Sequence, residues 1–415
     1  MLLIRNLSQL ATPLGRGPAR GSAMRKLHVV EDAAIAIDGE RIAFAGRERD
    51  LPLALRQRIE EDVDARRATA LPGFVDSHTH IPFAGYREAE FNRRLQGESY
   101  EAIAQGGGGI ASSVRATRAA SAEELTSNIL RRTETMALFG TTTAEAKSGY
   151  GLTLEDELKQ LRAIRESSAS SPVRLIPTCL AAHEFPPEAR NDPEARAEYL
   201  RLIVEAIVPA AAREHLALFC DAFVERGVFT AEEGERVLRS GLAHGLTPRL
   251  HADELSDTGG AALAASLRAA SADHLMHVSG EGIAALAASD TVANLLPATS
   301  FFLMSDRYAP ARRLIDSGAI VSLSTDCNPG SAMTESMQIV LQLAALQMRM
   351  TVEEVITAAT LNGAYSLRMS EEIGSLEAGK RADLILLDAP NYLHMVYHFG
   401  VNLVTAVYRD GVRIV

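Results

Sequence analysis

Two histidines near residue 80 stand out because His78 and His80 end a short apolar run that begins at Leu71. On a strand, this spacing places both rings on the same face. Two imidazoles at the end of one strand can bind a single divalent cation, and neutral imidazole nitrogen suits zinc or iron. A pair of exposed loop histidines has the same short pattern. The interpretation therefore depends on ligand-type residues further along the chain.

Other strand-like runs also lead into polar side chains that can bind a metal or move a proton. These segments are Glu145 to Tyr150, His183-Glu184, His251 to Glu254, Asp273-His274 and Ser324 to Gly330. Alone, His274 would be typical of a core histidine and Asp326 of a turn residue. Four residues could together supply three nitrogens and one carboxylate to one metal and leave a position for water: His78, His80, His251 and Asp326. The set predicts a metal-dependent hydrolase.

The elements that must position these residues alternate between strand-like and helical patterns. Eight strand-like runs lie around Phe74 and at 141–147, 173–180, 216–225, 247–253, 272–278, 291–298 and 319–326. Helix starts are expected at Ser121, Thr153 and Thr351, each followed by acidic residues. Eight such units predict an α/β fold, a (β/α)8 TIM-like barrel over residues 67–368, whose active site lies at the carboxyl ends of the strands.

Both ends of the chain carry short strands with turn signals. Asp38-Gly39-Glu40 separates two runs near the start, and Asp410-Gly411 separates two more near the end. We therefore expect residues 1–66 and 369–415 to form one small β-sandwich domain together.

Composition limits the classes of partner. The 415 residues carry 42 Lys and Arg against 53 Asp and Glu, a net charge of -11, which argues against nucleic-acid binding and favours a small-molecule substrate. No apolar run approaches the roughly 20 residues that cross a bilayer. Three widely spaced cysteines predict a reducing compartment, the cytoplasm. Four arginines precede the first acidic residue, a pattern that a transit peptide also shows, but we expect Leu2 to Leu10 to form a strand instead.

Three features invite other interpretations. The glycine run 106–109 lacks the Gly-Lys-Ser/Thr of a phosphate loop, so a flexible lid is expected instead. Lys147 lies on the second strand-like run rather than on the fourth, and we interpret it as structural and the site as mononuclear. The Cys327 side chain should point away from the face that Asp326 occupies.

The arrangement resembles the amidohydrolase superfamily, and 374–383 is similar to that superfamily's carboxy-terminal signature. Within it, the chain resembles the imidazolonepropionase family along nearly its whole length. The motifs that carry this resemblance are Asp76-Ser-His-Thr-His80 with Arg87, Gly107-Gly-Gly-Ile110, Glu145-Ala-Lys-Ser-Gly-Tyr-Gly151, His251-Ala-Asp-Glu254, Ala272-Asp-His274 and Asp326-Cys-Asn-Pro-Gly330.

The resemblance implies hydrolysis of the cyclic C–N bond of 4-imidazolone-5-propanoate to N-formimidoyl-L-glutamate in histidine degradation, with one Zn or Fe ion per chain and a homodimer. It implies the metal ligands His78, His80, His251 and Asp326. It implies acid-group contacts from Arg87, Tyr150, Asn328, Gly330 and Ser331, and ring contacts from His183 and Glu254. His274 matches a proton-handling position.

Elementary chemistry agrees with this allocation. Ring opening needs water to attack a carbonyl carbon, and Glu254 or Asp326 could take the proton of that water. His274 could share in moving a proton to the departing nitrogen. The propionate tail of the substrate is an anion, which the guanidinium of Arg87 can bind through two parallel hydrogen bonds.

Two alternatives remain open from the sequence. A deaminase or another cyclic-amide hydrolase of the same architecture would have no use for Arg87 and Tyr150. A non-enzymatic metal-binding protein would not need Glu254 and His274. Nitrogen and carboxylate ligands do not distinguish zinc from iron.

Overall fold

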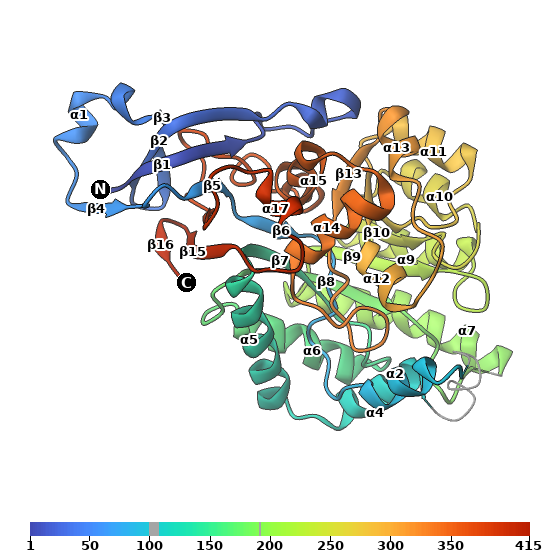
Figure 1. The fold of residues 1–415 in the computed structure, drawn as a ribbon. Coiled ribbons are helices and arrows are strands. Elements are labelled where there is room, and N and C mark those ends of the chain that lie inside the picture. The colour runs from blue at the N-terminus through green and yellow to red at the C-terminus, as the bar shows by residue number, and fades with distance from the viewer. Residues whose placement is uncertain (99–107, 191) are drawn as a thin grey trace.

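The computed structural model describes residues 1–98, 108–190 and 192–415. Figure 1 shows a mixed β-sheet on one side of a barrel whose strands are surrounded by helices, and both chain termini lie at the mixed sheet. Of the expected lid at 106–109, residues 106 and 107 lie outside the described residues. Among those that are described, no helix is both long and apolar enough to cross a membrane.

The mixed sheet is built from both ends of the chain. Its strand order is β16-β15-β14-β5-β1-β2-β3, and β4 also pairs with β1. The strands are β1 (Leu2–Thr12), β2 (His28–Asp38), β3 (Arg41–Arg47), β4 (Glu61–Asp64), β5 (Thr69–Pro72), β14 (Leu384–Leu387), β15 (Val404–Arg409) and β16 (Val412–Arg413). Hydrogen bonds join all eight strands into one continuous sheet. Side chains from the two ends of the chain, such as Ile35 and Leu386, share one hydrophobic core.

β5 is the strand that connects the two ends. It pairs parallel with β1 and antiparallel with β14, where Leu71 lies opposite Ile385. It lies just inside the range that was expected for the barrel, and it leads through Gly73 directly into the first barrel strand. A Cβ at Gly73 would overlap the side chain of Thr142, so this close passage requires glycine.

The second sheet contains eight parallel strands in the order β13-β12-β11-β10-β9-β8-β7-β6. The strands are β6 (Phe74–Asp76), β7 (Thr141–Lys147), β8 (Arg174–Ala182), β9 (Phe219–Val224), β10 (Thr247–Ala252), β11 (Ser271–His274), β12 (Val292–Leu295) and β13 (Ile320–Leu323). Just beyond β6 and β13 the two edges meet, because His80 N donates to Cys327 O (3.0 Å) and Asp326 N donates to His78 O (3.1 Å). The predicted (β/α)8 barrel is confirmed.

Helices follow the strands around the barrel, and short helical segments also connect strands of the mixed sheet. Their bounds are η1 (Gly21–Arg25), η2 (Glu48–Asp50), α1 (Leu53–Arg56), α2 (Glu88–Leu95), α4 (Ile110–Ala119), α5 (Ala122–Leu138), α6 (Leu154–Ser167), α7 (Pro193–Leu202), η3 (Ile203–Ile207), α8 (Val208–Arg213), α9 (Ala231–Ala243), α10 (Gly260–Ser266), α11 (Gly280–Ala287), α12 (Pro297–Phe302), α13 (Ala311–Asp316), α14 (Met337–Met348), α15 (Val352–Ala359), α16 (Leu361–Ser366) and α17 (His394–Tyr397). The three expected helix starts are confirmed, since Ser121, Thr153 and Thr351 each accept a backbone N–H in the first turn.

Candidate active site

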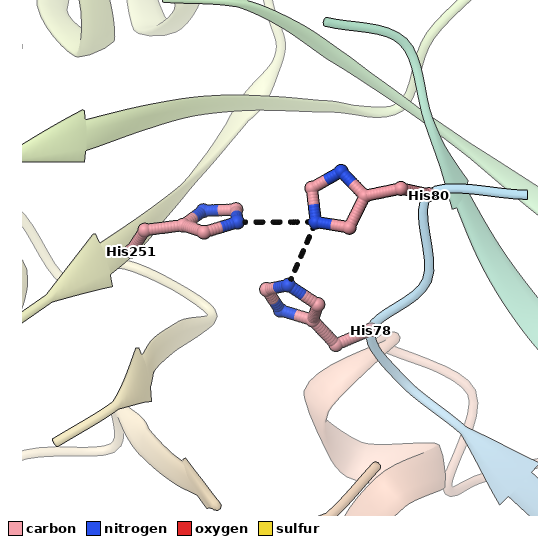
Figure 2. A group of neighbouring side chains, drawn as sticks. All are labelled: His78, His80 and His251. Carbon is pink, nitrogen blue, oxygen red and sulfur yellow. Dashed lines mark hydrogen bonds between the residues drawn. The ribbon is translucent and has the colours of Figure 1, made fainter. Parts of the chain in front are cut away.

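Four predicted metal ligands meet at the carboxyl end of the barrel. Nε2 of His80 lies 3.3 Å from Nε2 of His78 and 3.4 Å from Nε2 of His251. Figure 2 shows the three rings pointing toward one another, two from the segment after β6 and one from β10. Oδ1 of Asp326 lies 3.5 Å from His78 Nε2 and 3.4 Å from His80 Nε2.

The donor set fits a divalent cation. The other ring nitrogen of His78 lies 2.9 Å from Asp273 Oδ2, and that of His251 lies 3.1 Å from Asp221 Oδ2. A carboxylate fixes the proton on the near nitrogen, so that Nε2 presents its lone pair. Lone pairs and a carboxylate that converge in a buried space repel one another unless a cation lies between them. His78, His80, His251 and Asp326 would hold that cation.

A layer of buried charged side chains lies next to the metal ligands. Nζ of Lys147 lies 2.7 Å from Asp221 and 2.8 Å from Glu145, and Arg249 Nε lies 3.0 Å from Glu145. All of these side chains, including Asp273, have 0% exposure. Lys147 therefore neutralises the carboxylates behind the histidines, which agrees with the structural role expected for it. Asp221 and Arg249 were not predicted from the sequence; the signal that could have indicated them is a charged residue inside an otherwise apolar strand.

A cavity of about 420 Å³ is lined by three of the four ligands, His80, His251 and Asp326. Its lining contains every predicted site residue except the fully buried His78: His80, Arg87, Tyr150, His183, His251, Glu254, His274, Asp326, Asn328, Gly330 and Ser331. Arg94 and Phe223 also line it and were not predicted. Cys327 is buried outside this lining, as its expected direction requires.

Glu254 and His274 lie together on one wall of the cavity. Oε1 of Glu254 is 3.7 Å from Nδ1 of His274. Burial, together with the charges of Asp326 and Glu225, raises the pKa of Glu254 to about 8. Burial lowers the pKa of His274 to about 3, so this ring is neutral. Glu254 can therefore accept and release a proton near neutral pH, while the adjacent His274 ring stays neutral.

Asp326 is fixed by its backbone and by a hydroxyl. Its φ of 56° is in the left-handed region, which an ordinary residue adopts at a cost that the surrounding structure must compensate. Thr299 Oγ1, from α12, donates to Asp326 Oδ2 at 2.7 Å. Because Oδ1 faces the histidines, both carboxylate oxygens are engaged. Thr299 carries no local sequence signal for this role.

Arg87 also lines the cavity. It is in the loop after β6, directly before α2, and its Nε lies 2.8 Å from Glu90. A Cβ at Gly330 would overlap the guanidinium, so the loop after β13 packs directly on Arg87. Asn328 shapes that loop, because its Oδ1 accepts the N–H groups of Gly330 and Ser331 at 2.8 Å each. Arg94 donates to Gly330 O at 3.2 Å.

Tyr150 and His183 form the side of the cavity next to His80. The His183 ring stacks on His80 with centroids 4.9 Å apart, and it lies 5.2 Å from the Tyr150 ring. Nδ1 of His183 donates to Gly149 O at 3.0 Å, because a carbonyl oxygen can only accept. Burial lowers the pKa of His183 to about 3. The neutral ring therefore keeps Nε2 as a hydrogen-bond acceptor.

Comparison with known proteins places this architecture in a class. The model of the amidohydrolase family matches residues 69–414, and the chain belongs to that family. Solved structures of similar fold include an adenosine deaminase from Xanthomonas campestris with bound zinc (19% identity, TM-score 0.71, 99% of this chain and 92% of that one). A 5-methylcytosine deaminase from Klebsiella pneumoniae has 16% identity and a TM-score of 0.74, over 100% and 98% of the two chains. These likenesses show the fold.

Curated relatives of known name identify the family more narrowly than these solved structures do. An imidazolonepropionase of Brevibacillus brevis is 44% identical over 99% of this chain and 97% of its own length. One of Porphyromonas gingivalis is 46% identical over 99% and 96%. The chain therefore belongs to the imidazolonepropionases.

Proposed function

We propose that the protein hydrolyses the ring of 4-imidazolone-5-propanoate to N-formimidoyl-L-glutamate, a step of histidine degradation. The observation that carries this proposal is one cavity that is lined both by metal ligands and by Arg87. A ring beside the metal ligands with an anionic tail bound by the guanidinium has the chemistry that this lining recognises. A tailless ring, such as a deaminase substrate, would have no anionic group for a guanidinium in the cavity lining to recognise.

We propose that one Zn or Fe ion per chain is held by His78, His80, His251 and Asp326. When bound, the ion supplies Lewis-acid chemistry that lowers the pKa of water from about 16 toward roughly 7. Family membership and the buried His/Asp groups support a metal ion. We also propose that the protein forms a homodimer and acts in the cytoplasm.

In the proposed reaction, water oxygen forms a bond to the ring carbonyl carbon, and the bond from that carbon to the ring nitrogen breaks. Glu254 takes the proton of the water and delivers it to the departing nitrogen, which becomes part of the formimidoyl group. Both oxygens of Asp326 are already engaged, which favours Glu254 as the base. Neutral His274, 3.7 Å away, helps to hold the proton on this wall.

The remaining residues of the cavity divide into those that would contact the ring and those that would contact the tail. His183 presents an acceptor Nε2 to a ring N–H, and Tyr150 lies beside it. Arg87 would bind the tail carboxylate, while Asn328, Gly330 and Ser331 form the loop against which the carboxylate and the guanidinium pack. Together these contacts orient the ring so that its carbonyl faces the cation site.

Substrate identity is tested with Arg87→Ala and an imidazolone that lacks the carboxylate. Loss of a charge-assisted contact should lower kcat/KM for the tailed substrate about 10- to 150-fold, mostly through KM. The variant should process the tailless ring no worse than the wild type does. Arg239→Ala, which removes an exposed arginine paired with Glu235, is the control and should behave as wild type. If both enzymes discriminate equally between the substrates, Arg87 does not bind the tail.

A further inference from the structure

The loop that carries Tyr150 is held by two side chains of the helix that follows it. Gly149 N donates to Glu157 Oε2 at 3.0 Å, and the N–H groups of Gly151 and Leu152 both donate to Glu157 Oε1 at 2.8 Å. Tyr150 N donates to Gln160 Oε1 at 3.1 Å. All four backbone N–H groups of residues 149–152 thus donate to side chains of α6.

Glu157 is an unusual side chain for a structural loop contact. It has 0% exposure, and it takes part in none of the ion pairs of the described residues. Burial raises its pKa, while the Ser148 hydroxyl and the three backbone N–H donors favour its charged form. A fully satisfied buried network of this kind fixes one geometry, because each alternative leaves a polar group without a partner.

The same contacts connect three parts of the cavity. Gln160 Nε2 donates to Pro82 O at 2.7 Å, in the segment that leads from the metal ligands toward Arg87. Gly149 O accepts from His183. Gly149 has a φ of 113°, and a Cβ there would lie 2.9 Å from Leu180 O, so the backbone passes too close to β8 for another residue. The position of the loop is therefore fixed by contacts with α6, with His183 and with β8.

We propose that Glu157 and Gln160 are positioning residues for substrate binding, which act by fixing the Tyr150 loop. This inference rests on the proposed function, because it assigns Tyr150 to the substrate. Neither side chain lines the cavity, so each acts through the backbone of residues 149–152. Their loss should change how well the substrate is held more than how fast the bound ring opens.

The test uses Glu157→Gln, which keeps the shape but replaces one accepting oxygen with an N–H₂ group. One backbone N–H then faces a donor, and KM should rise roughly 5- to 30-fold with kcat within about 3-fold. Gln160→Met removes the acceptor of Tyr150 N and should raise KM in the same direction. The control is Glu354→Gln, another fully buried glutamate, which caps α15 away from the cavity and should leave KM unchanged.

A double-mutant cycle separates positioning from general damage. In a Tyr150→Phe background, Glu157→Gln should raise KM by less than about 2-fold, since the contact that it positions is already lost. An equal rise in both backgrounds overturns the proposal. If Glu157→Gln does not fold, the same cycle with Gln160→Met decides.

Amide hydrogen exchange tests the loop without any substrate. Residues 149–152 should be protected in the wild type and should exchange at least about 10-fold faster in Glu157→Gln, with other barrel segments unchanged. Unprotected amides in the wild type overturn the inference. A wild type that is protected at these amides but leaves imidazolone propionate unchanged would instead contradict the proposed function.

Discussion

Lys147→Met is the perturbation whose cost can be worked out most fully from the structure. The wild type has three buried carboxylates, Glu145, Asp221 and Asp273, against two buried cations, Lys147 and Arg249, a net charge of -1. Removing the ammonium changes this to -2 with nearly the same volume. Breaking a buried ion pair from one side typically costs about 3–5 kcal/mol, so we expect the free energy of unfolding to fall by that amount at neutral pH.

The pH dependence of this loss of stability shows whether the broken ion pair with Asp221 causes it. Burial raises the pKa of Asp221, but Lys147 and His251 bring it well below its usual value. In the wild type, this carboxylate therefore stabilises the fold above about pH 4 and loses that effect as the pH falls further. Without the ammonium, burial dominates and the folded pKa of Asp221 rises. The penalty of Lys147→Met should then grow as the pH rises from 5 to 8.

The assay is chemical denaturation of both proteins at pH 5 and pH 8, with zinc in excess and with a chelator. Lys380→Met is the matched control, because Lys380 is nearly as buried, with 1% exposure, but its Nζ donates to Gly15 O at 2.7 Å, and neither residue lines the cavity. We expect this control to lose about 1–3 kcal/mol with little pH dependence. A Lys147→Met penalty that equals the control and stays constant with pH would refute the reasoning.

Three further results are expected. Glu254→Gln should fold and keep its metal but lose roughly 10²-fold or more in kcat. The increase of kcat/KM with pH, which ionisation of Glu254 produces in the wild type, should disappear in this variant. Near-normal turnover would instead assign the role of general base to Asp326. Gly330→Ala should push the Arg87 guanidinium aside and raise KM roughly 10-fold without unfolding the protein, and an unchanged KM would show that the tail lies elsewhere. Elemental analysis should find about one Zn or Fe per chain, and activity lost to a chelator should return with one equivalent; activity that tracks a second equivalent contradicts a mononuclear site.

The strand ends could be predicted from the sequence because their signals are local. His78 and His80 follow an apolar run at the spacing that a strand requires, and His251 and Asp326 end runs of the same kind. Because parallel barrel strands end on one face, such residues are brought together by topology alone. The structure places all four within a few ångströms of one another.

The residues that hold these ligands could not be predicted in the same way. Lys147 and Asp221 pair across 74 positions of sequence, so their partnership depends on strand register. Thr299 looks like an ordinary residue near a helix start. Glu157 belongs to an acidic first turn, which favours a helix N-terminus wherever it occurs, so its inward direction has no separate signal.

The position at which water enters the product tests the central claim most directly. Purified protein would be incubated with 4-imidazolone-5-propanoate in water enriched in ¹⁸O, with ultraviolet absorbance to follow loss of the ring and mass spectrometry to identify the product. The account predicts N-formimidoyl-L-glutamate with one ¹⁸O in the newly formed carboxylate, because water attacks the ring carbonyl carbon and the C–N bond breaks. Loss of absorbance without this labelled product, or no loss with the metal-loaded protein, would contradict it.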